Sequence, residues 1–133
     1  MRDKKAVVLV VDDEQGIRDM LSWYLGQREF EVHTAPDGRA AEEVLSRQPV
    51  DLVISDVTMP KLNGLQLLDA IGRLKPGPAV IMMTGFGTVE TAVHAMRRGA
   101  ADFLLKPFDL EHLISRVSEV ISGAGRAAYS TNL

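Results

Sequence analysis

The stretch AVVLVVDDE at residues 6–14 places six consecutive apolar residues directly before three acidic ones. A short, nearly continuous apolar run of this kind is typical of a strand buried on both faces of a parallel sheet. Two further runs of the same character lie at 52–55 and 79–84. The run at 31–35 is more polar, which favours an edge strand, and a fifth run occupies 102–105. The sequence therefore predicts five strands.

Between and after these runs, apolar residues recur with helical spacing. The apolar stripes lie within residues 17–25, 41–45, 67–74, 89–96 and 110–121. Gly99 is suited to end the fourth helix, and Asp109 is suited to cap the start of the fifth. Strict alternation of strand and helix predicts a parallel sheet with helices on both faces and right-handed crossovers. We therefore expect an α/β, doubly wound (βα)5 fold of the flavodoxin-like type, with five parallel strands in the order 2-1-3-4-5.

Length and composition limit the classes of function. The 133 residues suffice for one domain, expected over 1–122, and the aperiodic stretch GAGRAAYSTNL at 123–133 reads as a linker or an added tail. With 15 basic and 18 acidic side chains, the net charge of −3 argues against a dedicated nucleic-acid-binding domain. The absence of cysteine excludes disulfides, thiolate metal sites and cysteine nucleophiles. Apolar runs are too short for a transmembrane helix or a signal peptide, so we expect no membrane contact and a cytoplasmic location.

Polar residues follow four of the predicted strands. Asp12 and Asp13 follow the first strand, Asp56 the third, Thr84 ends the fourth, and Lys106 follows the fifth. In an open parallel sheet, ligands bind at the carboxyl ends of the strands, where the strand order reverses. Three carboxylates gathered there repel one another, which favours a cation, and an oxygen-only ligand set suits Mg²⁺. Lysine and hydroxyl groups beside Mg²⁺ suit a phosphoryl group, and one carboxylate is a candidate nucleophile that would form an aspartyl phosphate.

Each of these residues also has an ordinary explanation when it is taken alone. Asp12 and Asp13 could cap the first helix, and Asp56 could belong to a turn. Thr84 could be a plain strand end, and Lys106 could lie in a surface loop. Their common position at one edge of the predicted sheet favours the functional interpretation of the whole set.

Taken together, the motifs resemble the receiver domain of bacterial two-component response regulators over about residues 5–122. The matching segments are VVDDE (10–14), SDVTMPKLNG (55–64), MTG (83–85) and DFLLKPF (102–108). A segment around the last two, TGFGTVETAVHAMRRGAADFLLKPF, is similar to receivers attached to sigma-54-dependent, nitrogen-regulation-type transcription activators.

The resemblance implies a role for each site residue. Asp56 would be the phosphoacceptor, and Mg²⁺ would be held by Asp12, Asp13, Asp56 and the backbone carbonyl of Thr58. The phosphoryl group would be bound by Lys106, by the Thr84 hydroxyl and by the backbone amides of Thr58 and Gly85. Thr84 and Phe103 would form the switch, and the Lys106–Pro107 peptide bond would be cis.

The resemblance also implies partners. A histidine kinase would be the phosphodonor, and the face formed by the fourth helix, fifth strand and fifth helix would contact an output domain or a second copy of the chain. Such a receiver is a switch that assists its own phosphorylation and dephosphorylation rather than a turnover enzyme, and its output would include transcription.

Two alternatives remain open. One is a Mg²⁺-dependent phosphatase with an aspartyl-phosphate intermediate, although such enzymes carry Asp-x-Asp after the first strand and this chain has Asp12-Asp13-Glu14. The other is an interaction module that is never phosphorylated.

Overall fold

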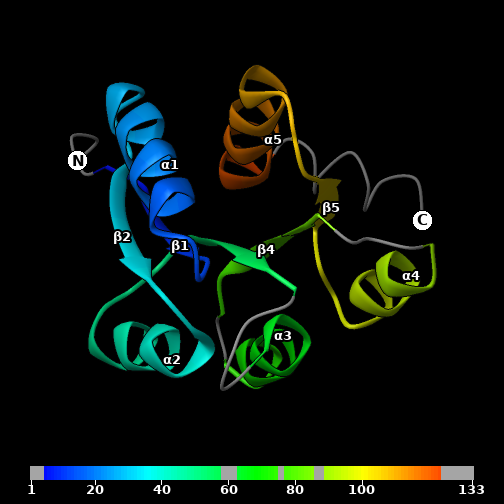
Figure 1. Ribbon diagram of the computed structural model, residues 1–133. Helices are drawn as coiled ribbons and strands as arrows, with labels where there is room; N and C mark the ends of the chain where they lie inside the picture. The colour runs from blue at the N-terminus through cyan, green and yellow to red at the C-terminus, as the bar shows by residue number, and fades with distance from the viewer. Residues whose placement is uncertain (1–4, 58–62, 75–76, 86–88, 124–133) are drawn as a thin grey trace.

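A five-stranded parallel sheet lies between two layers of helices (Figure 1). This computed structural model describes residues 5–57, 63–74, 77–85 and 89–123. The strands are β1 (Val7–Val11), β2 (Glu31–Ala35), β3 (Leu52–Asp56), β4 (Ala79–Thr84) and β5 (Asp102–Leu105). The helices are α1 (Gln15–Gln27), α2 (Gly38–Arg47), α3 (Gly64–Gly72), α4 (Val89–Arg97) and α5 (Leu110–Ser122).

The sheet has the order β2-β1-β3-β4-β5, which confirms the predicted fold and the edge position of β2. Helices α1 and α5 cover one face of the sheet, and α2, α3 and α4 cover the other (Figure 1). The strand order reverses at β1: β2 lies on one side of β1, and β3, β4 and β5 follow one another on its other side. The carboxyl ends of β1 and β3 therefore lie side by side.

Two apolar cores, one on each face, fix the sheet between the helices. Val8 and Val10 of β1 pack toward α1 and α5, whereas Leu9 and Val11 pack toward α2 and α3. All five residues of β1 are buried, as are those of β3. Burial on both faces explains why these strands read as continuous apolar runs in the sequence. β1 and β3 are each covered on both faces and paired with a strand on either side, so their carboxyl ends are firm supports for polar side chains.

The helix ends follow capping rules that the sequence makes visible. The Asp109 carboxylate accepts a hydrogen bond from the Glu111 amide at 2.9 Å, which confirms the expected cap of α5. Gly99 has a φ of 101° just after α4, as the sequence predicts for the residue that ends this helix. Asn63 and Gln66 form a reciprocal capping box at the start of α3.

Glu29 takes the place that glycine usually holds at the end of a helix. It has a φ of 67°, and the Glu29 and Phe30 amides donate to the carbonyls of Gly26 and Leu25 at 3.1 and 3.2 Å. Since a side chain disfavours this left-handed conformation, Glu29→Gly should raise the free energy of unfolding by about 0.5–1 kcal/mol. Urea unfolding checks this; Glu29→Ala should bring no comparable gain, and an unchanged or lower stability for Glu29→Gly would contradict it.

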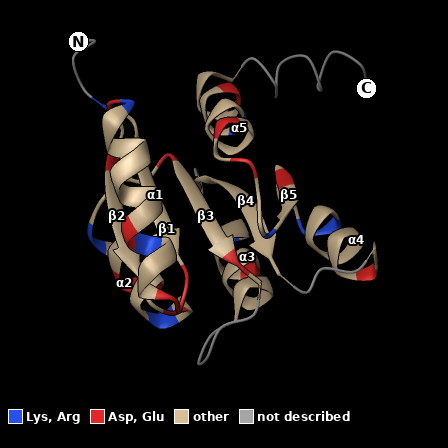
Figure 2. Cartoon of the chain, turned by 45° about the horizontal axis from the view of Figure 1, so that its top comes forward, with Lys and Arg blue, Asp and Glu red and all other residues tan. Residues whose placement is uncertain are grey.

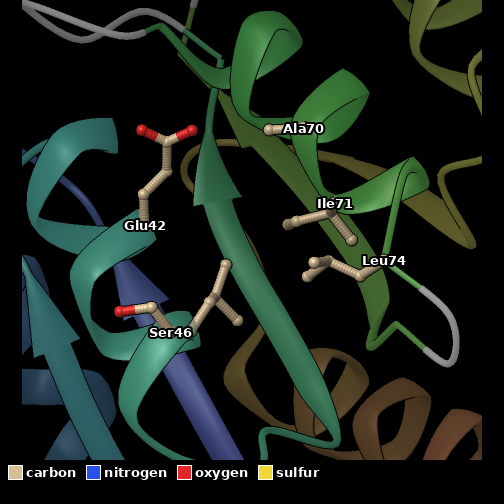
Figure 3. A pocket seen from close by; sticks show the side chains of 6 residues that line it. Glu42, Ser46, Ala70, Ile71 and Leu74 are labelled. Atoms are coloured by element: carbon tan, nitrogen blue, oxygen red, sulfur yellow. The ribbon is translucent and has the colours of Figure 1, made fainter.

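A shallow hollow of about 160 Å³ lies between α2 and α3 (Figure 3). Glu42 and Ser46 of α2 face Ala70, Ile71 and Leu74 across it (Figure 3). Its volume is below the roughly 300 Å³ at which small-molecule sites begin, so we regard it as an imperfection in helix packing. Among the described helices, none has the length and apolar character needed to cross a bilayer.

Candidate phosphoryl and metal site

Five of the residues expected at the site lie at the carboxyl edge of the sheet. Asp12 and Asp13 directly follow β1, Asp56 ends β3, Thr84 ends β4, and Lys106 directly follows β5. Figure 2 shows acidic residues in red where β1 and β3 end. Parallel strands deliver their carboxyl ends to one edge, so four separate segments of the chain contribute to one cluster.

Three carboxylates converge at this edge. Asp12, Asp13 and Asp56 each offer an oxygen, and these oxygens all lie within 4.8 Å of one another. Asp12 is fully buried, Asp56 is nearly so, and Asp13 is exposed. A set of hard oxygen donors with one exposed member fits Mg²⁺, which keeps several of its waters when a protein binds it.

Lys106 neutralises part of this negative charge. Its Nζ lies 2.8 Å from Asp12 Oδ2, 3.1 Å from Asp56 Oδ2 and 3.6 Å from Glu14 Oε1. Burial acts to lower the pKa of Lys106, but the hydrogen bonds and charges of Asp12 and Asp56 outweigh it, so the pKa lies above its ordinary value. The lysine is therefore a firm cation that already touches the expected phosphoacceptor.

Thr84 and Phe103 lie on the same face of the sheet. The Thr84 side chain is buried, with 2% exposure, and its carbonyl accepts a hydrogen bond from the Lys106 amide at 2.8 Å. Phe103 pairs in register with Met82, two residues before Thr84, and packs against the core under α4. Because residues two apart on a strand point to the same face, the Thr84 and Phe103 side chains both face the α4 layer.

Two further expectations concern Gly85 and the Lys106–Pro107 peptide bond, and a third concerns Thr58. Gly85 is exposed next to Lys106, and the Lys106–Pro107 peptide bond is cis. Thr58, expected to give a carbonyl to the metal and an amide to the phosphoryl group, lies outside the described residues.

Gly64 allows α3 to begin close to Asp56, the expected phosphoacceptor. Its amide donates to the Val57 carbonyl at 2.8 Å. A Cβ at this position would collide with the backbone of Asp56 and Val57 and would lie 2.8 Å from the Met82 methyl group. Only glycine therefore permits this close packing beneath the end of β3.

Sequence reasoning assigned no role to Glu14 or Arg18, which both touch the cluster. The Glu14 amide donates to Asp12 Oδ1 at 2.9 Å, and Arg18 Nη1 donates to the Asp12 carbonyl at 2.8 Å. Positions 14 and 18 lie one helical turn apart, so both occupy the side of α1 nearest the acids. The spacing was the only signal in the sequence, and such spacing is common on exposed helix faces.

Comparison with known proteins identifies the family. The model of the response regulator receiver domain matches residues 8–118. The chain is 38% identical over 113 residues to the response regulator protein PilR of Pseudomonas aeruginosa, covering 85% of this chain and 25% of that protein. It is also 38% identical over 117 residues to the DNA-binding transcriptional regulator NtrC of Azospirillum brasilense, covering 88% of this chain and 24% of that protein. The chain thus spans about a quarter of the length of these relatives.

Solved structures agree with this result. The chemotaxis protein CheY4 of Vibrio cholerae superposes with a TM-score of 0.82 at 34% identity, covering 88% of this chain and 99% of that one. NtrX of Brucella abortus superposes with a TM-score of 0.84 at 36% identity, covering 97% of this chain and 30% of that one. The sequence match, the strand order and the acidic edge lead to one conclusion: this chain belongs to the family of response regulator receiver domains.

Proposed function

We propose that the chain is a phosphorylation-controlled switch that takes a phosphoryl group from a histidine kinase onto Asp56 in a Mg²⁺-dependent reaction. The observation that carries the proposal is the position of the Asp56 carboxylate. It ends a rigid, buried strand, lies 3.1 Å from the Lys106 ammonium, and is within 4.8 Å of oxygens of Asp12 and Asp13. A nucleophile, a fixed cation and a metal-binding pair are thus held together without any movement of the backbone.

In the proposed reaction, an Asp56 carboxylate oxygen attacks the phosphorus atom of a phosphohistidine. The new oxygen–phosphorus bond forms as the nitrogen–phosphorus bond breaks, and the leaving imidazole takes up a proton. The Lys106 ammonium, which pairs with the carboxylate before the reaction, then pairs with a phosphoryl oxygen. The Thr84 hydroxyl and the Gly85 amide bind the other phosphoryl oxygens. Asp12, Asp13 and Asp56 would hold Mg²⁺, which supplies countercharge to the phosphoryl oxygens when bound.

The output surface of the proposal is the α4–β5–α5 face. Val89, Val93 and Met96 of α4 and Leu105 of β5 are exposed by 82, 39, 43 and 56%. Apolar side chains exposed together on one face favour a contact with another protein surface. We propose that inward rotation of the Thr84 hydroxyl toward a phosphoryl oxygen makes room for Phe103, and that this shift alters the face toward an output domain or a second copy of the chain.

The proposal includes no direct contact of this domain with nucleic acid, and it includes a cytoplasmic location, which is typical of the family. It also distinguishes the chain from an aspartyl-phosphate phosphatase. Such phosphatases carry Asp-x-Asp after the first strand, whereas here Asp12 and Asp13 are adjacent. Asp12 also pairs with Lys106 but is fully buried, and the partly exposed carboxylate beside the lysine is Asp56, at the end of β3. The full-length relatives are about four times as long as this chain and have room for an attached output domain.

The proposal is tested by following phosphate in the presence of Mg²⁺ and acetyl phosphate. A receiver should take up one phosphoryl group per chain and then release phosphate slowly. Steady release over many turnovers, also with unrelated phosphate esters, would identify a phosphatase instead. A chain that never takes up phosphate would be an interaction module.

Mg²⁺ should stabilise the unphosphorylated chain, because it relieves repulsion among Asp12, Asp13 and Asp56. At ten times its dissociation constant, a ligand bound only by the native state raises the free energy of unfolding by about 1.4 kcal/mol. Asp13→Asn should remove most of this gain, whereas Glu42→Gln on exposed α2 should retain it. Melting curves with and without Mg²⁺ measure both, and curves that coincide for the parent chain would show that the acids do not bind the ion.

A further inference from the structure

Every polar atom of Asp12 has a hydrogen-bond partner. Its amide donates to the Ala35 carbonyl at 3.1 Å, and its Oδ1 accepts from the Glu14 amide at 2.9 Å. Its Oδ2 accepts from Lys106 Nζ at 2.8 Å, and its carbonyl accepts from Arg18 Nη1 at 2.8 Å. Asp12 is therefore held on four sides: two of its partners, Ala35 and Glu14, are backbone groups, and the other two, Lys106 and Arg18, are long side chains. Lys106 bonds the Asp12 carboxylate, whereas Arg18 bonds the Asp12 backbone.

The position of Arg18 is electrostatically unfavourable for the helix. The Arg18 amide donates to the Glu14 carbonyl at 3.2 Å, so the residue lies in the first turn of α1. A cation near a helix N-terminus opposes the helix dipole. The Arg18 side chain folds back to the carbonyl of Asp12, two residues before the N-cap residue Glu14. The Glu14 side chain itself makes no capping hydrogen bond. The contact with Asp12 is thus the compensating feature of this arginine.

Asp13 lies between the two anchored ends of this turn. Asp12 is fixed by Arg18 on one side, and the Glu14 amide is fixed by the Asp12 carboxylate on the other. The Asp13 side chain is exposed, so packing does not determine its direction. The backbone of residues 12–14 sets the direction of its Cα–Cβ bond and therefore the region that its carboxylate can reach.

We propose that Arg18 is a positioning residue for the metal site: by holding the Asp12 carbonyl, it orients the turn 12–14 so that the Asp13 carboxylate faces Asp56. This inference rests on the proposed function, because it assigns Asp13 to the metal. Residues that orient metal ligands through hydrogen bonds commonly change metal affinity by about 10–100-fold when they are removed. Arg18 would act in this way on a carboxylate that it does not itself touch.

The alternative role for Arg18 is that of a nearby positive charge, and the two roles predict effects of opposite sign. A cation close to the acids repels Mg²⁺, so its removal would tighten binding of the ion. A positioning residue holds a ligand in place, so its removal would weaken binding. The direction of the change in Mg²⁺ affinity therefore separates the two roles.

The experiment measures Mg²⁺ binding to the unphosphorylated chain by titration calorimetry. Arg18→Met should raise the dissociation constant about tenfold, and Arg18→Lys, which keeps one donor and the charge, should fall between Arg18→Met and the parent. Arg28→Met is the matched control. It also removes one cation, at the C-cap of α1, where Arg28 pairs with Glu111 at 3.1 Å on the surface, and it should leave the dissociation constant unchanged.

A second measurement separates positioning from a general loss of structure. With acetyl phosphate as donor, Arg18→Met should be phosphorylated about tenfold more slowly than the parent at low Mg²⁺, and the two rates should converge at saturating Mg²⁺. A damaged fold would lower the rate at every Mg²⁺ concentration.

The possible outcomes are distinct. Unchanged or tighter Mg²⁺ binding in Arg18→Met would overturn the inference while leaving the proposed function intact. If Arg18→Met does not fold, Arg18→Lys decides the question, and parent-like or tighter affinity in both it and a folded Arg18→Gln would overturn the inference. A parent chain that binds no Mg²⁺ would overturn the proposed function together with this inference.

Discussion

Asp56→Asn is expected to abolish phosphate incorporation completely. The asparagine amide has nearly the shape of the carboxylate but lacks its nucleophilic charge. Asp12 is also close to Lys106, at 2.8 Å, yet it is fully buried and both of its carboxylate oxygens accept hydrogen bonds within the protein. Asp56 is 7% exposed at the end of β3, so a donor can reach it. Among the three clustered carboxylates, Asp56 is the one that combines contact with the lysine and access from outside. Glu14 is exposed and lies 3.6 Å from Lys106 Nζ, but it does not belong to the group of three acids.

The loss is measured by intact mass after incubation with Mg²⁺ and a small phosphodonor. Asp13→Asn is the control, because it removes an acid from the same cluster and should slow the reaction without removing the acceptor. Asp56→Asn should remain folded, since it removes one of three repelling charges. A stoichiometric phosphate adduct in Asp56→Asn would refute the assignment of the acceptor.

Lys106→Met should lower the free energy of unfolding by about 3 kcal/mol in the absence of Mg²⁺. Removing one partner of a buried ion pair leaves an uncompensated charge, and such changes commonly cost about 3–5 kcal/mol. Here two carboxylates lose their common partner, with side-chain exposures of 0% for Asp12 and 10% for Asp56. Because the pKa of Lys106 is raised, its stabilising contribution is fully present below the ordinary lysine value of 10.5 and is lost only as the pH rises through the higher folded value.

Urea unfolding with and without Mg²⁺ tests this expectation. Mg²⁺ should restore part of the lost stability, since it replaces the missing positive charge. Arg116→Met is the matched control, because Arg116 bonds Asp102 at 2.6 Å in a more exposed ion pair. This substitution should lower the free energy of unfolding by less, and by the same amount with and without Mg²⁺. Equal stability of Lys106→Met and the parent in Mg²⁺-free buffer would show that the lysine does not balance the acids.

The sequence was sufficient to predict the sheet, because burial on both faces leaves a clear pattern. All five strands occupy the predicted runs, with β1 beginning one residue later and β3 ending one residue later than its run. The helices were located by their apolar stripes, but their ends were visible only where a capping residue such as Asp109 or Gly99 stands. At Glu29 the residue type gives no sign of the left-handed backbone that ends α1, since the position lacks the usual glycine.

The carboxylate cluster was predictable because strand ends in a parallel sheet converge. The contacts between side chains were not. Glu14 and Arg18 lie on a helix face whose residues in most proteins are simply solvated, so nothing in their spacing reveals that Arg18 folds back onto the Asp12 carbonyl. Lys106 reaches three carboxylates at once because the end of β5 directs it across the sheet edge, a geometry that no local pattern encodes.

The central claim is that Asp56 carries the phosphoryl group as an acyl phosphate. The most direct test is to phosphorylate the chain with acetyl phosphate and Mg²⁺, reduce it with borohydride, and sequence its peptides by mass spectrometry. Borohydride reduces an aspartyl phosphate to homoserine and leaves ordinary carboxylates and phosphate esters unchanged. We predict homoserine at position 56 and at no other aspartate. Homoserine at position 12 or 13, or an unreduced phosphate ester on Thr84 or another hydroxyl residue, would contradict the account.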